Sequence, residues 1–233
     1  MNRTEEKYTK YALCKEMLET ADVIRNFDPM RTAAIAEVVK AKGKLMLTGE
    51  GSSRIMPAKL AIRRALTEGL DVQIVTDGSR QSMTYKLDEF AIFAASNSGR
   101  TKEVVKLLQA QKAAGNDALF GMTAQEDNLL KEYTAETLVL TCGWENAVAA
   151  TKSVVEQAMN YQSLLCHIAG MSTSGCEVTK NNVADAIEAA LTMDIPAKIV
   201  QAAAGAGVIH FAGYDDGVAE ELTLKTNEIT RKK

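Results

Sequence analysis

Cysteine, proline and aromatic residues are scarce in this sequence of 233 residues, which has 4 Cys, 3 Pro and 5% aromatic residues. The four cysteines, Cys14, Cys142, Cys166 and Cys176, follow no CxxC or zinc-ligand spacing, so neither a disulfide framework nor a metal site is expected. So little proline, with only 15 glycines, excludes a collagen-like or linker-rich chain. We therefore expect a cytoplasmic, reduced protein with helices packed on a sheet rather than an all-β barrel.

Net charge and long apolar runs are also lacking. The 27 Lys and Arg residues nearly balance the 30 Asp and Glu residues, which leaves a formal charge of −3. Without an excess of positive charge, neither nucleic acid nor an anionic membrane is an expected partner. No apolar run reaches the roughly 18 residues that span a bilayer, and residues 1–9 are polar, unlike a secretory leader.

Strands that alternate with helices are predicted within residues 44–170. The apolar runs expected to be strands are 45–48, 72–75, 90–95, 118–122 and 137–140, and the helices of this region are expected at 55–66, 101–114 and 147–168. This alternation is typical of a parallel sheet built from βα units. Because the runs are apolar throughout, helices should cover both faces. We predict a three-layer, doubly wound α/β domain with a five-stranded parallel sheet.

The rest of the chain is predicted to be mainly helical. Residues 1–43 form a helical arm whose expected role is packing, because no residue pattern in it suggests chemistry. Residues 171–206 form a helical connector. A strand at 208–211 and a helix at 218–229 then predict the incomplete beginning of a second α/β domain over residues 207–233.

Two hydroxyl-rich turns each follow a predicted strand and precede a helix. They are Gly51-Ser52-Ser53 and Ser96-Asn97-Ser98-Gly99-Arg100-Thr101. A helix N-terminus offers unpaired N–H groups and a partial positive charge, which suit a phosphate. A simpler alternative is that Ser98 or Thr101 only caps the helix. Neither turn is a Walker loop, and Gly49-x-Gly51 lacks the third glycine of a dinucleotide fingerprint.

A third turn, Trp-Glu-Asn-Ala-Val-Ala-Ala-Thr-Lys at residues 144–152, precedes the long helix. Either Asn146 caps that helix and Lys152 is solvated, or the turn lines the same pocket as the other two. The histidines are expected to be packing residues. His167 is predicted to be buried packing or a helix-end cation, and His210 to lie in the core on a strand.

Three motifs, Gly-x-Gly-Ser-Ser, Ser-Asn-Ser-Gly-Arg-Thr and Glu-x-x-Val-Ala-x-Thr-Lys, occur in this order and at intervals that resemble the sugar isomerase (SIS) domain family. The resemblance is to the isomerase half of glucosamine-6-phosphate synthase, over residues 44–170 and more weakly over 207–230. It implies a flavodoxin-like sheet, a first SIS domain, the start of a second one, a phosphosugar ligand and a homodimer. Neither a cofactor nor a metal is expected.

The resemblance assigns phosphate or sugar binding to residues of all three turns. These residues are Gly51, Ser52, Ser53, Ser96, Asn97, Ser98, Thr101 and Val148. Three positions depart from the family pattern: Asn97 replaces a Gln, Arg100 replaces a Glu and adds a cation near the phosphate, and Ala150 replaces a Ser. The phosphate end should therefore persist, while the sugar end is expected to recognise a different substrate.

Glu221, Lys225 and Glu228 match the helix that carries catalysis in the family and share one helix face. A solvated stripe of charge is the plainer interpretation. The resemblance implies that Glu228 is the base that moves a proton between C1 and C2 of a 6-phosphosugar through an enediol. Lys225 would be its electrostatic neighbour.

The expected activity is that of an aldose–ketose isomerase or a related sugar-phosphate lyase or deglycase. The family's ring-opening histidine and closing lysine would lie beyond Lys233, so the chain is expected to be a catalytically incomplete fragment. The alternative is a phosphosugar sensor or regulator without catalysis. The lack of a basic helix-turn-helix arm argues against a DNA-binding regulator.

Overall fold

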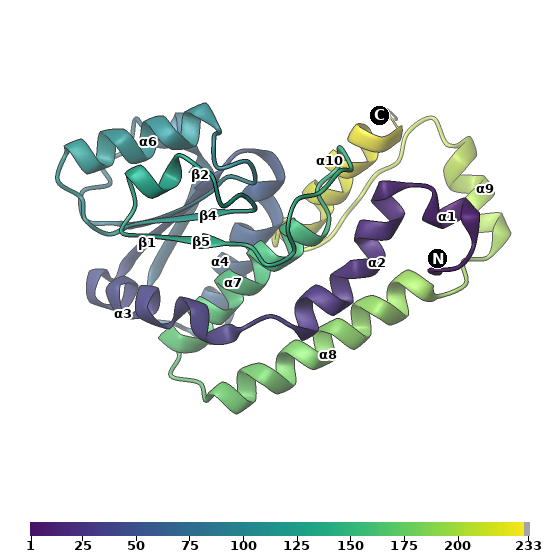
Figure 1. Cartoon of the computed structure of the whole chain (residues 1–233), viewed down its shortest axis with the longest axis horizontal. Coiled ribbons are helices and arrows are strands. Elements are labelled where there is room, and N and C mark those ends of the chain that lie inside the picture. Colours follow the sequence, from purple (N-terminus) through teal and green to yellow (C-terminus); the bar gives the residue numbers. More distant parts are fainter. Residues whose placement is uncertain (231–233) are drawn as a thin grey trace.

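A five-stranded parallel sheet forms the centre of the computed structural model, which describes residues 1–230, with residues 173–178 described by their backbone alone (Figure 1). Its strands are β1 (Lys44–Gly49), β2 (Gln73–Gly78), β3 (Ala91–Ala95), β4 (Leu119–Thr123) and β5 (Glu136–Val139). They lie in the order β2-β1-β3-β4-β5, and each neighbouring pair is parallel. This is the flavodoxin-like order, so the predicted fold class is confirmed.

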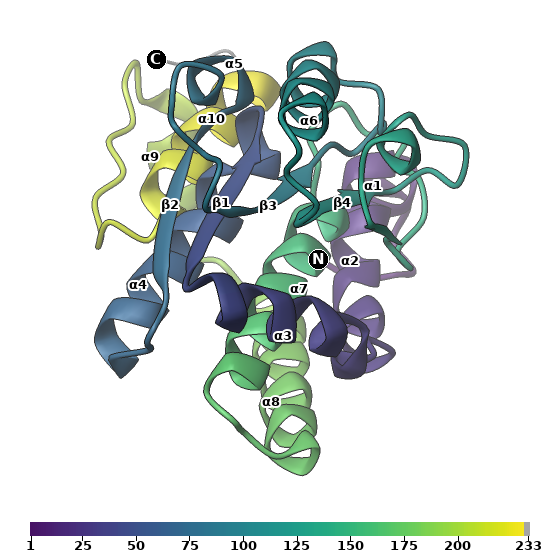
Figure 2. The same cartoon turned by 90° about the vertical axis from the view of Figure 1, so that its left-hand side faces the viewer.

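Helices cover both faces of the sheet, as the apolar strands predict (Figure 2). Successive strand residues point to opposite faces. Leu45 and Leu47 therefore pack in a core with α3 (Ala33–Lys42), α4 (Ile55–Glu68) and α7 (Lys152–Ile168). Between them, Met46 packs in a second core with α6 (Lys102–Ala113). The short helices near these layers are η1 (Pro29–Thr32), η2 (Gly51–Ser53), α5 (Ser79–Ser82) and η3 (Leu130–Glu132).

The helix α7 is buried along most of its length. Tyr161 places its ring edge-on against Phe93 of β3, with the centroids 5.3 Å apart. The flanks of α7 contact α3 and α4, and its remaining side faces α2 (Ala12–Arg25). The helix begins five residues later than the predicted position 147, because residues 146–151 form a turn around a buried carboxylate.

The N-terminal arm and the connector lie side by side. The short α1 (Glu6–Thr9) leads into α2, which runs along α8 (Thr173–Thr192) (Figure 1). Arg25 pairs with Asp185 at 2.9 Å and also with Glu188, and the N-terminal amine donates to the Leu191 carbonyl at 2.7 Å. The arm is thus held against the connector by contacts between distant parts of the sequence.

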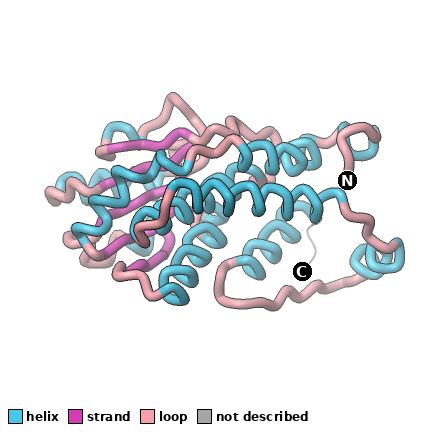
Figure 3. Tube along the Cα trace, turned by 90° about the horizontal axis from the view of Figure 1, so that it is seen from below, coloured by secondary structure: helices cyan, strands magenta, loops and turns pink. Residues whose placement is uncertain are grey.

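The expected strand at 208–211 is wrong. Residues 206–217 run as a long loop between α9 (Ala197–Gly205) and α10 (Val218–Thr230) (Figure 3). A strand is stable only when another strand completes its hydrogen bonds, and within residues 1–230 no strand pairs with this segment. His210, expected in the core, is exposed for the same reason. Whether residues 207–233 begin a second domain stays a prediction, and 231–233 lie outside the described residues.

The helix α10 packs on α4 through a close backbone contact at its first turn. Gly217 has a φ of +82°, and a Cβ built on it would lie 2.6 Å from the Ile55 carbonyl oxygen. Lys59 of α4 reaches Asp215 at 2.9 Å and Glu220 at 2.6 Å. Among the described residues, no helix is long and apolar enough to cross a membrane.

Candidate functional site

The turns that follow β1 and β3 meet at the carboxyl edge of the sheet. The two strands are direct neighbours, with Thr48 paired to Ala94. A Cβ built on Gly49 would lie 2.8 Å from the Ala95 carbonyl oxygen and 3.2 Å from the Ser53 Cβ. Only glycine fits such an approach without displacement. The structure therefore brings together the first two predicted phosphate-binding turns.

The second turn is held by its own hydroxyl groups. The Ser96 and Thr101 oxygens are 2.7 Å apart, and the Thr101 N–H donates to Ser96 Oγ at 3.3 Å. Ser98 Oγ accepts from the Arg100 N–H at 3.2 Å. Thr101 occupies the N-cap position of α6, but its side chain makes no capping bond. The hydroxyls of Ser98 and Thr101 thus shape the turn and do not cap the helix.

Gly99 fixes the second turn against the loop after β4. Its φ of +63° is left-handed, and a Cβ on it would lie 2.3 Å from the Asn128 Cβ. Asn97 lies beside this contact, since its carbonyl oxygen accepts from the Ala124 N–H at 3.0 Å. The Asn97 side-chain oxygen is buried and has no hydrogen-bond partner among the described residues. An unpaired buried acceptor is costly, so Asn97 is a group that a bound donor or water would satisfy.

The cation expected beside the phosphate points elsewhere. The Arg100 guanidinium is half exposed and pairs with the Asp127 carboxylate at 2.6 Å. That ion pair lies at the surface, where such pairs contribute little to stability. Arg100 therefore faces a carboxylate in the described structure, not the turn.

The first turn is braced by the adjacent edge strand. Glu50 Oε1 accepts from the Ser79 N–H at 2.9 Å, and the Ser79 and Thr48 hydroxyl oxygens are 3.0 Å apart. At the end of β2, the Tyr85 hydroxyl donates a hydrogen bond to the Asp77 carboxylate. This bond lowers the pKa of Asp77 by more than burial raises it, so the pKa lies below its usual value. Glu50 and Ser79 were not expected at the site. Their sequence signals were the Thr-Asp-Gly-Ser turn at the end of β2 for Ser79 and the position of Glu50 between two glycines at the end of β1.

The third turn, residues 144–151, folds around the carboxylate of Glu145, which is almost completely buried. Glu145 accepts from the N–H and hydroxyl of Thr151 at 2.6 and 2.7 Å, and from the Ser153 hydroxyl. Thr151, not Asn146, occupies the N-cap position of α7. Val148 projects from the turn and is 95% exposed. The Asn146 capping alternative is therefore wrong.

Two carboxylates of α2 reach the same turn. Glu16 accepts from the Asn146 N–H at 2.5 Å and from the Ala147 N–H at 3.2 Å. Glu19 pairs with Lys152 at 2.6 Å. Burial lowers the pKa of Lys152, but the hydrogen bond and charge of Glu19 outweigh it, so the pKa is raised. Lys152 is thus paired and not solvated.

From the sequence the arm was expected to have a packing role only, and Glu16 and Glu19 were not expected at the site. Glu16 shares the buried face of α2 with Thr20 and Ile24. Burying a carboxylate there is costly unless hydrogen-bond donors contact it. A buried-face Glu on an amphipathic helix was the one signal for it.

The helix α10 carries a charged stripe, of which Glu228 lines a cavity near the third turn. Lys225 Nζ lies 3.0 Å from Glu228 Oε2 and 3.5 Å from Glu221 Oε1, and Glu221 is buried. A cavity of about 300 Å³ is lined by Glu228 and Ile229 of α10, Tyr11, Ala12 and Leu13 of the arm, and Ala147, Val148 and Ala149 of the turn. The structure thus brings Glu228 and Val148 to one cavity, while the hydroxyl groups of the first two turns do not line it.

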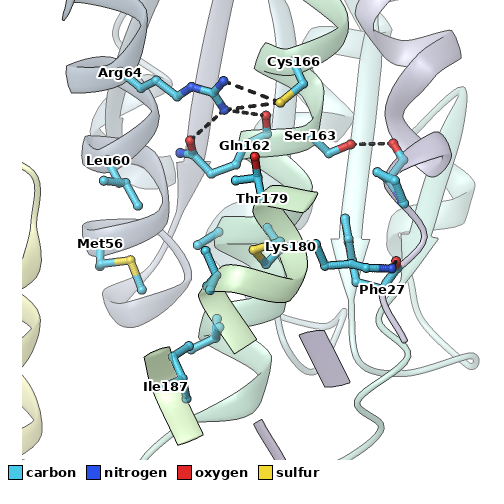
Figure 4. Close-up of a pocket in the computed structure, with 15 residues that line it drawn as sticks. Phe27, Met56, Leu60, Arg64, Gln162, Ser163, Cys166, Thr179, Lys180 and Ile187 are labelled. Atoms are coloured by element: carbon cyan, nitrogen blue, oxygen red, sulfur yellow. Dashed lines mark hydrogen bonds between the residues drawn. The ribbon is translucent and has the colours of Figure 1, made fainter. Parts of the chain in front are cut away.

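A larger, mainly apolar cavity of about 340 Å³ lies between α4, α7 and α8 (Figure 4). Met56 and Leu60 line one wall, and Ile187 lines another. At one end the Arg64 guanidinium donates to Gln162 and Cys166. His167 lines neither cavity. Its Nε2 lies 2.8 Å from the Pro29 carbonyl oxygen, which agrees with its expected packing role.

Comparison with known proteins identifies relatives of this fold. The model of the SIS domain family matches residues 37–166. No curated protein matches the chain. A solved structure from Silicibacter pomeroyi, named as that of a phosphosugar isomerase, is 22% identical with a TM-score of 0.78, covering 93% of this chain and 68% of that one.

Two further structures are similar. The C-terminal domain of the glucosamine-fructose-6-phosphate aminotransferase of Francisella tularensis is 18% identical with a TM-score of 0.77, covering 98% of this chain and 70% of that one. The glucosamine-6-phosphate deaminase of Thermotoga maritima is 20% identical with a TM-score of 0.72, covering 95% and 68%. At these identities the likeness establishes the fold.

Proposed function

The chain belongs to the SIS domain family, and from this we propose that it binds a phosphorylated sugar at the carboxyl edge of its sheet. The observation that carries the proposal is the contact of Gly49 with the Ala95 carbonyl, which joins two hydroxyl-rich turns at the beginnings of α4 and α6. Hydroxyl groups and free N–H groups at helix N-termini suit a phosphate. Similar structures are named for enzymes of phosphorylated sugars, which supports this ligand class.

Within this proposal, Ser53, Ser96, Ser98 and Thr101 bind the phosphate, together with Gly51, Ser52 and Asn97. The unpaired side-chain oxygen of Asn97 accepts from a sugar hydroxyl or a bridging water. The backbone of Val148 meets the sugar, since this residue stands out from the third turn. Arg100 turns to the phosphate only if its pair with Asp127 opens.

For the reaction we propose aldose–ketose isomerisation by Glu228. Its carboxylate removes the proton from C2 of the open-chain aldose, and the O1 oxygen takes up a proton, which gives an enediol. The proton on Glu228 exchanges with solvent before it is delivered to C1, or back to C2, and the hydroxyl proton of O2 is released as the C2 carbonyl forms. The substrate is oxidised at one carbon and reduced at the next, so no co-reactant is needed. The ammonium group of Lys225 lies 3.0 Å from the Glu228 carboxylate, as its electrostatic neighbour. The shared cavity of Glu228 and Val148 supports the assignment.

A sensor without catalysis is the second candidate, and the histidines favour it. Opening a sugar ring calls for an acid or base besides Glu228. The chain has 2 histidines. His167 is bonded to the Pro29 carbonyl, and His210 is exposed in the loop 206–217. By itself, the described site therefore suits binding, or exchange on a substrate that is already open.

Calorimetry tests the binding proposal. Glucose 6-phosphate, fructose 6-phosphate and glucosamine 6-phosphate are titrated into the protein, beside the same sugars without phosphate and beside inorganic phosphate. We expect the phosphorylated sugars to bind and the free sugars not to, because each charge-assisted bond to phosphate contributes about 1.5–3 kcal/mol. Equal binding of free and phosphorylated sugars would refute the assignment of the turns.

Solvent exchange of the C2 proton tests the reaction. The protein is incubated with the ligand in D2O, and deuterium at C2 is followed by NMR. We expect Glu228→Gln, which keeps the shape but removes the base, to bind with unchanged affinity and to abolish exchange. Glu37→Gln, an exposed change on α3, is the control. Binding without any exchange by the unaltered protein would favour the sensor.

A further inference from the structure

We propose that Glu16 of α2 is a positioning residue that holds the third turn in the shape required for sugar binding. The N-terminal arm would thereby be part of the site. The inference rests on the proposed function, because the turn matters for affinity only if a phosphosugar binds beside it. It differs from that proposal in concerning a residue of the arm that contacts no substrate.

The first step is the geometry of the Glu16 carboxylate. Its two oxygens accept from two successive backbone N–H groups, of Asn146 at 2.5 Å and of Ala147 at 3.2 Å. Glu16 is 5% exposed, so these bonds compete with little water. A carboxylate that receives two backbone donors in a buried place fixes both peptide groups, and charge-assisted bonds of this kind are strong.

The second step concerns the part of the third turn that the two carboxylates do not hold. The turn is tied at its other end by Glu145, which holds Thr151 and Ser153. Residues 148–150, which lie between the residues bonded to Glu16 and those bonded to Glu145, receive no hydrogen bond from either carboxylate. Val148 is the most exposed of these and is the proposed sugar contact. Glu16 therefore sets where the chain leaves the anchored part and enters the cavity.

The third step is that the arm meets the turn and its cavity at several points. Lys152, the first residue of α7, pairs with Glu19 at 2.6 Å, one turn along α2 from Glu16. At the beginning of α2, Tyr11 and Ala12 line the same cavity as Val148 and Glu228. A shift of α2 would change the wall of the cavity and the position of the turn together.

The turn carries its own optical probe. Trp144 is the one tryptophan in the sequence and directly precedes Glu145. Its side chain is 53% exposed. Its fluorescence therefore reports on the turn with no added label.

The test is the variant Glu16→Gln, which keeps the size but places an amide N–H against one of the two backbone N–H donors. We expect a shift of Trp144 emission, faster hydrogen exchange of amides 145–151, unchanged exchange of the β3 amides, and a dissociation constant for the bound 6-phosphosugar raised tenfold or more. Glu19→Gln, whose carboxylate is half exposed, should give a smaller change of the same kind. Glu37→Gln should change none of these.

The outcomes separate the two proposals. Unchanged emission, exchange and affinity in Glu16→Gln would overturn the inference. So would faster exchange throughout β3, because Glu16 would then serve the whole fold. Loss of the turn's protection in a protein that binds no phosphosugar would support the role of Glu16 in holding the turn but refute the proposed function. Lower affinity with an unaltered sheet would support both.

Discussion

At the scale of single residues, the hydroxyl of Thr101 is the most direct probe of the phosphate turn. Thr101→Val keeps the branched shape and removes the oxygen that lies 2.7 Å from Ser96 Oγ. Because that oxygen makes no capping bond, we expect little change in melting temperature. Affinity for a 6-phosphosugar should fall about tenfold, which corresponds to about 1.4 kcal/mol. Calorimetry and thermal unfolding of the same sample check the two effects.

The control for Thr101 lies on α4, which covers the other face of the sheet. Thr67 of α4 donates its hydroxyl to the Arg64 carbonyl on an exposed face, so Thr67→Val removes a similar bond away from the turns. We expect unchanged affinity there. A Thr101→Val protein that melts earlier and binds as tightly as before would show that the hydroxyl serves stability alone.

Single residues also show how far the sequence alone reaches. The hydroxyl-rich turns could be predicted, because apolar runs that end in Gly and Ser mark strand ends whatever surrounds them. Glu16 and Glu19 could not, since the N–H groups and the lysine they bind lie about 130 residues away in the chain. The beginning of α7 was misplaced for a related reason, as the buried carboxylate of Glu145 draws residues 146–151 out of the helix.

At the scale of elements, the docking of α10 depends on a glycine. Gly217 is left-handed and leaves no room for a Cβ beside the Ile55 carbonyl. We expect Gly217→Ala to weaken the docking by about 1–3 kcal/mol and to increase hydrogen exchange along α10, while the β3 amides keep their protection. In Gly213→Ala the new Cβ would meet only Ala219 at 3.9 Å, with no left-handed backbone. Equal exchange in both variants would contradict the docking contact.

The same helix is held by a titratable link. The hydrogen bonds that Lys59 donates to Glu220 and to Asp215 outweigh burial and raise the pKa of Lys59 above its ordinary 10.5. A raised pKa means that the link stabilises the folded state below pH 10.5 and is lost as the pH rises through the folded value. We expect the helical circular dichroism signal to fall at such pH. The loss of stability behind it should be the ~0.2–1 kcal/mol that a surface ion pair contributes. Lys59→Met should remove this pH dependence. If the variant and the unaltered protein lost the signal at the same pH and by the same amount, the role of Lys59 would be contradicted.

The strand expected at 208–211 belongs to the same scale. Apolar β-branched residues predict a strand locally, but pairing is a property of the sheet, and β2 and β5 are its edges. The segment lies apart as a loop, so a local pattern could not decide its structure. The parallel five-stranded sheet, by contrast, was predicted from the alternation of strands and helices, and its flavodoxin-like order was implied by the resemblance to the SIS family.

At the scale of the whole molecule, exposed apolar side chains on α9 and α10 point to self-association. No residue of α9 is buried, and Ile199 and Val200 are each more than half exposed. Leu222 of α10 is 45% exposed. We propose a homodimer or larger assembly that covers these faces. Light scattering at a protein concentration of roughly tens of micromolar should show a mass above that of one chain, if the chains associate with a micromolar dissociation constant.

Matched variants locate the interface. Ile199→Glu should favour the monomer, because burying an unpaired carboxylate is costly. Leu66→Glu changes a residue of α4 that is 77% exposed and should leave the assembly intact. A single chain at every concentration would refute the assembly, and dissociation by Leu66→Glu alone would place the interface elsewhere.

The contact between α2 and α8 also bears on the order of events on the ribosome. The arm is made first, yet its partners for Arg25 and for the N-terminal amine lie at residues 185–191. The sheet, with α3 to α7, can assemble as soon as residue 168 has emerged, because its contacts fall within that stretch. Until α8 appears, α2 has its contacts with α7 and the third turn but lacks those that Arg25 and the N-terminal amine make with α8. A nascent chain stalled after residue 168 should therefore be cut by protease within residues 1–25 faster than one stalled after α8, while the sheet resists in both.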